Sequence, residues 1–146
     1  MSTNKISLRL SGNLTPLEKL THTLGITPTK ILHRGERVSK NRVQPVDIWS
    51  LELVNFDDRT TKQDIEKQML QAAVVLKQIA PAIASLDRTK CKTDLYISTI
   101  REEDQGGLSL PTELVAAAAA AKLSIQMSIL VMLDDYEEPE AASINT

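Results

Sequence analysis

The chain has 146 residues and a formal net charge of −2, which argues for one domain and against a general attraction to nucleic acid. Hydrophobic residues make up 42% of the chain and aromatic residues only 3%, so an aliphatic core is expected and base-stacking platforms are scarce. A single cysteine, no signal-peptide pattern and no apolar run of about 20 residues together predict a cytoplasmic protein that does not span a membrane.

The start of the chain predicts a strand followed by a short helix. Apolar and polar residues alternate over 6–10, which is typical of a strand with one buried face. Leucines at helical spacing follow in 14–26, where we expect Thr15 to be the N-cap and Pro16 to lie in the first turn. Gly25 suits the left-handed end of this helix.

The segment KILHRGERVSKNRVQ, residues 30–44, carries five of the 17 Lys and Arg of the chain and a single acid. Its apolar residues follow neither helical nor strand spacing, it contains a glycine and an asparagine, and a proline follows it. We interpret it as a long loop or loose hairpin arm, in which Ile31 and Leu32 form a brief extended piece. Loops longer than about 12 residues in a compact domain are often functional.

Three more strands and two more helices are expected in the rest of the chain. The strands are predicted over 46–53, 93–100 and 123–131 because apolar and polar residues alternate there. A long helix is expected to begin at a Thr61–Asp64 capping pair and to stop or kink at Pro81. A third helix is expected within 109–123, which contains six consecutive alanines.

The resulting order is β-α-β-α-β-α-β, and the alternating strands indicate a sheet that is covered on one face. We therefore predict an α+β fold with a single layer of about four one-sided strands and helices packed on one face. The single domain is expected over 1–133. Residues 134–146 hold five acids and no Lys or Arg, which predicts a disordered acidic tail.

Common enzyme and metal motifs are missing from the sequence. There is no phosphate-binding GxxxxGK[ST] loop, no GxGxxG, no HExxH and no GxSxG. Two histidines and one cysteine do not make a zinc site of the usual kind. We lean towards a protein that is not an enzyme and expect no catalytic residue, cofactor or metal. A small hydrolase or transferase built on His33, Glu36 and an arginine stays open as a minor alternative.

The basic stretch 30–44 is the best candidate for a binding site. Its cations can hold phosphates or an acidic protein surface, and the lack of interleaved aromatic residues disfavours single-stranded nucleic acid. The candidate binding residues are Lys30, His33, Arg34, Glu36, Arg37, Lys40, Arg42 and Trp49. Two alternatives stay open: a solvated loop without a ligand, and an acidic tail that folds back onto the stretch.

Several segments follow one another in a familiar order: LRLSGNLTPLEKLTHTLGITPTKILHRGE, then IWSLEL, a long helix, and LSIQMSI. This order resembles the bacterial family known as domain of unknown function 4279, over about residues 5–131. The matching positions are Gly25, Pro28, Gly35, Glu36 and Trp49. The resemblance implies a compact α+β domain and no established reaction, and association of some relatives with toxin systems implies a small binding or immunity protein.

The matching positions have readable physical roles. Gly35 permits a backbone turn that other residues resist, and Glu36 is placed to pair with a neighbouring arginine. Trp49 is expected to anchor the loop on the core, with its indole N–H on a carbonyl. The leading hypothesis is a non-enzymatic, cytoplasmic protein-binding module whose partner is another protein or a second copy in a homodimer. The alternative is a binder of a phosphate-rich ligand, nucleic acid or nucleotide, through 30–44, and no membrane partner is expected.

Overall fold

The computed structural model describes residues 2–14, 16–103 and 106–132. The predicted acidic tail, 134–146, and the expected N-cap Thr15 lie outside these residues. The elements in chain order are β1 (Thr3–Gly12), α1 (Leu17–Leu24), β2 (Lys30–Leu32), β3 (Arg37–Ser39), β4 (Arg42–Val43), β5 (Asp47–Asp57), α2 (Lys62–Ala84), β6 (Cys91–Arg101), α3 (Thr112–Ala120) and β7 (Ser124–Val131).

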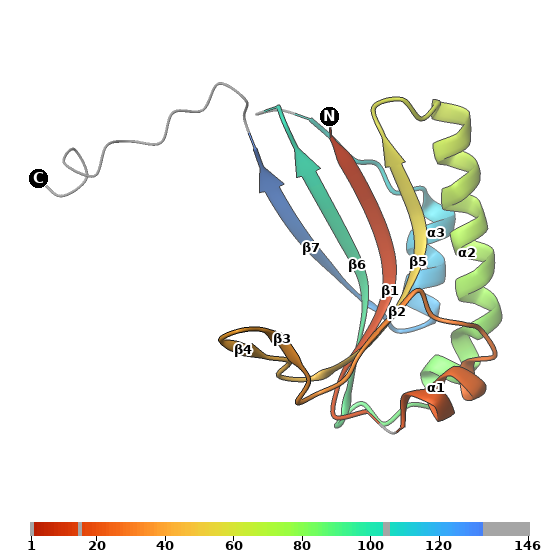
Figure 1. The fold of residues 1–146 in the computed structure, drawn as a ribbon. Coiled ribbons are helices and arrows are strands. Elements are labelled where there is room, and N and C mark those ends of the chain that lie inside the picture. Colours follow the sequence, from red (N-terminus) through yellow and green to blue (C-terminus); the bar gives the residue numbers. More distant parts are fainter. Residues whose placement is uncertain (1, 15, 104–105, 133–146) are drawn as a thin grey trace, which may run out of the picture.

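The described chain forms a mixed five-stranded sheet in the order β2-β5-β1-β6-β7, and β3 and β4 form a separate two-stranded sheet (Figure 1). All neighbours in the large sheet are antiparallel except β6 and β7, which are parallel and joined through α3. The α+β class is therefore confirmed, but the predicted order with about four strands is wrong. The additional strands are two or three residues long, too short to show an alternating pattern.

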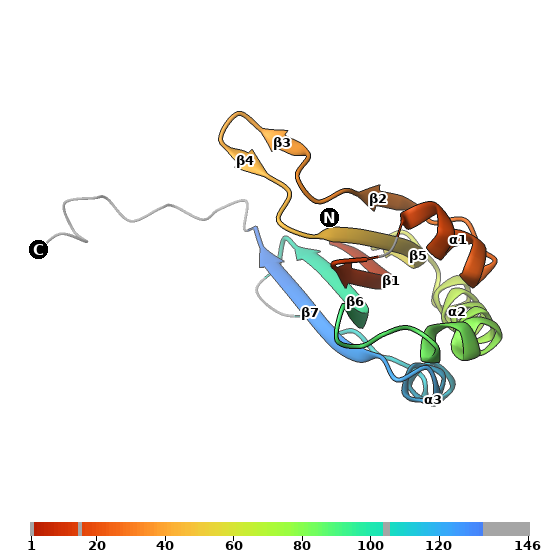
Figure 2. The same ribbon diagram turned by 90° about the horizontal axis from the view of Figure 1, so that it is seen from below.

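The helices lie on one side of the large sheet, which leaves its other face uncovered (Figures 1 and 2). The core forms where the inward residues of the central strands meet α2. Leu8 of β1 is paired with Leu95 of β6, and both are fully buried. Met69, Leu76 and Ile83 bring the apolar stripe of α2 onto this layer. The prediction of helices packed on one face of a one-sided sheet thus describes the arrangement.

A bulge interrupts the alternation that the sequence predicts in β5. Ile6 of β1 is paired with Val54, whereas Ser7 is paired with Glu52, so Leu53 is the additional residue. Val54 is buried as a result. The strand therefore runs beyond the expected end of the 46–53 segment and ends at Asp57.

The capping signals in the sequence predict some of the helix ends and not others. The Thr61 side chain accepts a hydrogen bond from the backbone N–H of Asp64 at 3.1 Å, which confirms the predicted cap of α2. The helix runs three residues beyond Pro81, to Ala84. Pro16 is the N-cap residue of α1, and Gly25 ends this helix with φ of 71°. Among the described residues, no helix is long and apolar enough to cross a membrane.

Candidate functional site

The basic stretch forms an arm that leaves the sheet, which we define as residues 33–46. Lys30, which precedes the arm, lies on β2 opposite Ser50 of β5. The chain then departs from the sheet edge, turns back through the β3–β4 hairpin and returns to β5. The arm projects on the side of the sheet that the helices leave uncovered (Figures 1 and 2).

Backbone hydrogen bonds close the base of the arm. Gly35 donates its N–H to the carbonyl of Gln44 at 2.9 Å, and Gln44 donates back to the carbonyl of Glu36 at 2.7 Å. Gly35 has φ of 89°, a left-handed conformation that favours glycine. Gln44 is buried, and its side-chain amide donates to the carbonyl of Val46 at 3.0 Å. The arm is therefore a hydrogen-bonded hairpin rather than an unstructured loop.

Asp47, the first residue of β5, holds the arm against the segment between β1 and α1. Its carboxylate accepts the backbone N–H of Arg34 at 2.7 Å and that of Leu14 at 3.2 Å. Hydrogen bonds to an ionised acceptor are stronger than neutral ones. Reasoning from the sequence missed this residue, although an acid at the first position of a strand that follows a proline-containing loop is a usable signal.

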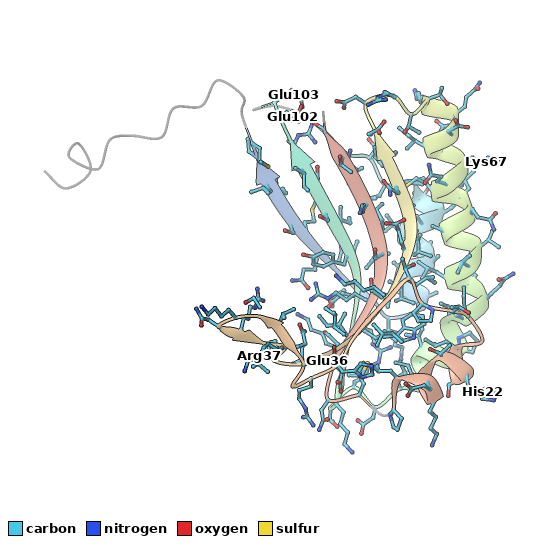
Figure 3. All side chains as sticks on the ribbon, in the orientation of Figure 1. His22, Glu36, Arg37, Lys67, Glu102 and Glu103 are labelled. Atoms are coloured by element: carbon cyan, nitrogen blue, oxygen red, sulfur yellow. The ribbon has the colours of Figure 1, made fainter. Side chains whose placement is uncertain are left out.

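The far end of the arm carries cations beside exposed apolar side chains. The Arg37 guanidinium donates to the carbonyl of Lys40 at 2.9 Å, which ties the turn between β3 and β4. Arg37 lies opposite Val43, and Arg42 lies opposite Ser39. Figure 3 shows Glu36 and Arg37 on this projection. Val38 and Val43 are 49% and 52% exposed, so the arm presents apolar as well as charged surface.

His33 and Glu36 lie together at the base of the arm. The His33 Nε2 atom is 3.9 Å from a Glu36 carboxylate oxygen, and both side chains are about half exposed. A protonated His33 would therefore pair with Glu36. Such an exposed pair contributes little to stability because water screens it.

Trp49 lies apart from the other candidate residues. Its side chain is fully buried, and its indole N–H donates to the hydroxyl of Thr21 in α1 at 3.0 Å. The prediction of a carbonyl acceptor is therefore wrong, because the indole N–H donates to a threonine hydroxyl. The structure brings six of the candidates together on the arm, places Lys30 on the adjacent strand and places Trp49 in the core. The arm residues are His33, Arg34, Glu36, Arg37, Lys40 and Arg42.

The uncovered face of the sheet is polar and partly charged. The Arg9 guanidinium lies 4.6 Å from the centre of the Tyr96 ring, a cation–π contact between β1 and β6. Lys5 Nζ is 3.9 Å from a Glu52 carboxylate oxygen across β1 and β5. This face and the arm lie on the same side of the molecule (Figure 1), which extends the polar surface.

A separate hollow of about 500 Å³ lies at the N-terminal end of α2, at the other end of β5 from the arm. Most of its wall is apolar, with Lys62, Glu66 and Glu113 also lining it. The apolar wall is formed by Phe56, Ile65, Met69, Leu70, Leu108, Leu110 and Pro111. These residues come from segments far apart in the sequence, so no local pattern indicated the hollow.

Outside the arm, the nucleophilic and metal-binding side chains of the described residues do not form another candidate site. Cys91 is buried, and burial raises the pKa of its thiol, with Arg88 opposing the shift. The neutral thiol is therefore favoured, which makes Cys91 a poor nucleophile. Among the described residues, no group of three or more His, Cys, Asp and Glu is placed to hold a metal ion.

No curated protein and no solved structure matches the chain. The family model described as domain of unknown function (DUF4279) matches residues 2–132, which covers nearly all of the described fold, including the arm. The match therefore includes the strands, the helices and the residues of the candidate site in one unit. The chain belongs to the domain of unknown function (DUF4279) family.

Proposed function

We propose that this chain is a non-enzymatic protein-binding module that holds an acidic surface of a partner protein through the arm and the uncovered sheet face. The observation that carries the proposal is the projecting hairpin, which combines three exposed cations with two half-exposed valines. The cations are Arg37, Lys40 and Arg42. Arginine is enriched at protein interfaces, where apolar contacts surround it.

The valines favour a protein partner over a phosphate-rich ligand. A phosphate site is built from cations and backbone N–H groups and gains nothing from exposed Val38 and Val43. Within the described residues, aromatic side chains for stacking bases are also missing from the arm. A partner with carboxylates around an apolar patch would match both kinds of side chain.

The hydrogen bonds at the base of the arm support the same proposal. Binding costs less ordering entropy when the binding element is already formed in the free protein. The Gly35–Gln44 and Gln44–Glu36 bonds and the Asp47 carboxylate hold the hairpin before any partner arrives. Arg9 on the uncovered face adds a further cation to this surface, whereas Lys5 is paired with Glu52.

The test compares two triple charge reversals with the same change in net charge. The arm variant is R37E/K40E/R42E, and the control variant K19E/K67E/K77E changes exposed lysines of α1 and α2. Partners cross-linked in host extract are identified by mass spectrometry, purified and titrated by calorimetry against both variants. We expect the arm variant to lose at least about tenfold in affinity, or ~1.4 kcal/mol, and the control to bind as the wild type does.

Equal affinities of the two variants would refute the proposal. A parallel titration measures the anisotropy of labelled duplex, single strand and nucleotide at low and high salt. Saturable binding that weakens steeply with salt and disappears in the arm variant would replace the protein partner with a phosphate-rich ligand. Trp49 fluorescence is a poor reporter for this titration because its indole is buried and bonded to Thr21.

A further inference from the structure

The strand β7 forms one edge of the large sheet and is exposed along its whole length. Every residue of β7 is exposed, whereas β1 in the middle of the sheet is mostly covered. Its apolar side chains Ile125, Met127, Ile129 and Val131 are 46% to 60% exposed. These four alternate along the strand and share one face, on which Ile125 and Met127 are paired with the buried Leu95 and Ile97 of β6. An apolar strip thus continues the core outward to an uncovered edge.

Edge strands are normally protected against pairing with another chain. They are short or carry charges, prolines or bulges, because their outer N–H and C=O groups otherwise invite a further strand. The opposite edge follows this rule, since β2 has only three residues. The segment from Ser124 to Met132 has none of these protections: it is long, regular and without charge or proline. Such an edge is suited to accept another strand.

The sequence of β7 is complementary to itself in the antiparallel direction. A two-fold axis at Ser128 would pair Ile125 with Val131 of the second copy and Met127 with Ile129. Each pair joins residues of the same face, so the two apolar strips would become continuous. This contact uses the same surface on both copies, and it closes as a dimer instead of growing into a fibre.

Charges at the two ends of this edge favour the antiparallel direction. Lys92 and Lys122 lie at the end where β7 begins, and both are exposed, so this end keeps a net positive charge although Lys92 Nζ is 4.0 Å from the Asp94 carboxylate. Glu102 and Glu103 follow β6 at the end where β7 finishes (Figure 3), and they outnumber the one cation there, Arg101, which is paired with Val131.

A two-fold axis brings the basic end of one copy to the acidic end of the other, at both ends of the contact. The charges on β6 would lie about 10 Å from the partner strand, close to the Debye length of about 8 Å at physiological salt. They set the direction of pairing, and the apolar strip and backbone hydrogen bonds supply the contact. A parallel arrangement would instead place like charges together.

We propose that a second copy of this chain pairs with the first through β7, antiparallel about a two-fold axis at Ser128. The two five-stranded sheets become one continuous sheet. The arm connects β2 and β5 at the opposite edge of the sheet, so the contact through β7 is independent of the proposed function. Arm variants leave the dimer unchanged, which separates failure of one proposal from failure of the other.

The first experiment measures the dissociation constant of the full chain by sedimentation equilibrium. Ile129→Lys places a charge on the edge at a position already 60% exposed, which a monomer tolerates. Val74→Lys makes a similar change at a side chain of α2 that is 47% exposed and serves as the control. We expect Ile129→Lys to weaken the dimer at least about tenfold, the effect of ~1.4 kcal/mol, while the control behaves as the wild type does.

The second experiment tests the register in a Cys91→Ala background. Ser128→Cys places two thiols opposite one another at the axis, about 5 Å apart between Cα atoms, within disulfide range. Gln126→Cys is the control, because four residues of strand, about 13 Å, would separate its two copies. We expect mild oxidation to give a covalent dimer with Ser128→Cys and none with Gln126→Cys.

Three results would overturn the proposal. The wild type could remain monomeric at all concentrations, the dimer could be insensitive to Ile129→Lys, or Ser128→Cys could fail to cross-link. Backbone amides of β7 protected from hydrogen exchange in a monomer would mean that a segment of the same chain covers the edge. Protection only in a complex with a different protein would assign the edge to that partner.

Discussion

At the scale of single residues, Gly12 shows how one missing side chain lets two segments meet. It is the last residue of β1 and has φ of 133°, a conformation that residues with a Cβ rarely adopt. A Cβ at this position would overlap the backbone carbonyl oxygen of Lys90, just before β6. The neighbouring Asn13 donates its N–H to the same carbonyl at 3.1 Å, so the close approach is part of the fold.

We therefore predict that Gly12→Ala lowers the free energy of unfolding by about 2–4 kcal/mol, since strain from φ and from the overlap both act. Gly25→Ala is the matched control because Gly25 also has positive φ, but a Cβ added there would meet nothing within 4 Å. The control is expected to lose only about 1–2 kcal/mol. Urea denaturation of both variants measures the difference, and equal losses would mean that the overlap with Lys90 is relieved at no cost.

At the scale of elements, the sequence predicted long regular segments well and short or irregular ones poorly. The strand around Leu8, the cap at Thr61 and the strand β7 carry strong local signals, and the structure confirms all three, although the apolar face of β7 that the alternation predicts to be buried is exposed. The strand β2 is three residues long, and Leu53 enters β5 as a bulge. Both depend on pairing with a distant strand, which no local pattern records.

The candidate site also has features that the sequence predicted and features that depend on distant contacts. The cationic composition of 30–44 indicated the arm, and Gly35 indicated its turn. The packing of Trp49 on the core was expected, but its hydrogen-bond acceptor Thr21 and the role of Asp47 depend on contacts with α1 and the residues before it, 28 and 33 positions away in the sequence. Reasoning from composition therefore located the arm but not the residues that hold it.

The stability of the arm should depend on the Asp47 carboxylate. Asp47→Ala removes the acceptor of the Arg34 and Leu14 N–H groups and should lower the free energy of unfolding by about 1.5–3 kcal/mol, the range for hydrogen bonds to a charged group. The amides of Arg34 and Leu14 should exchange faster with deuterium, as measured by NMR. Asp47→Asn keeps one acceptor oxygen and should lie between the wild type and Asp47→Ala. Unchanged exchange at both amides would show that backbone bonds alone hold the arm.

At the scale of the whole molecule, the two edges of the sheet have different structures. One edge ends in the short strand β2 and gives rise to the arm, and the other ends in the long, uncharged strand β7. The arm and the proposed self-pairing strand therefore lie at opposite edges of one sheet. A dimer formed through β7 would carry two arms, which would raise its avidity for a partner that offers two acidic surfaces at a matching distance.

Arg88, which lies in the chain between α2 and β6, contacts both helix ends and the sheet. Its guanidinium donates to the carbonyl of Lys122 at 3.1 Å and, at 3.4 Å, to those of Ile83 and Ala121. It also donates to the hydroxyl of Thr93 in β6. One side chain thus joins the ends of α2 and α3 to the sheet, and it adds donors to carbonyls at helix ends, where the helix itself supplies few.

Arg88→Ala should lower the free energy of unfolding by about 1–2 kcal/mol, because the carbonyl of Ala121 loses its side-chain donor, while those of Ile83 and Lys122 keep the Leu86 N–H and the Thr93 hydroxyl. Arg88→Lys keeps the charge but not the planar fork of donors, so it should recover less than half of the loss. Urea denaturation of the wild type and both variants measures this difference. A lysine variant as stable as the wild type would mean that the positive charge at the two helix ends matters, and not the simultaneous contacts.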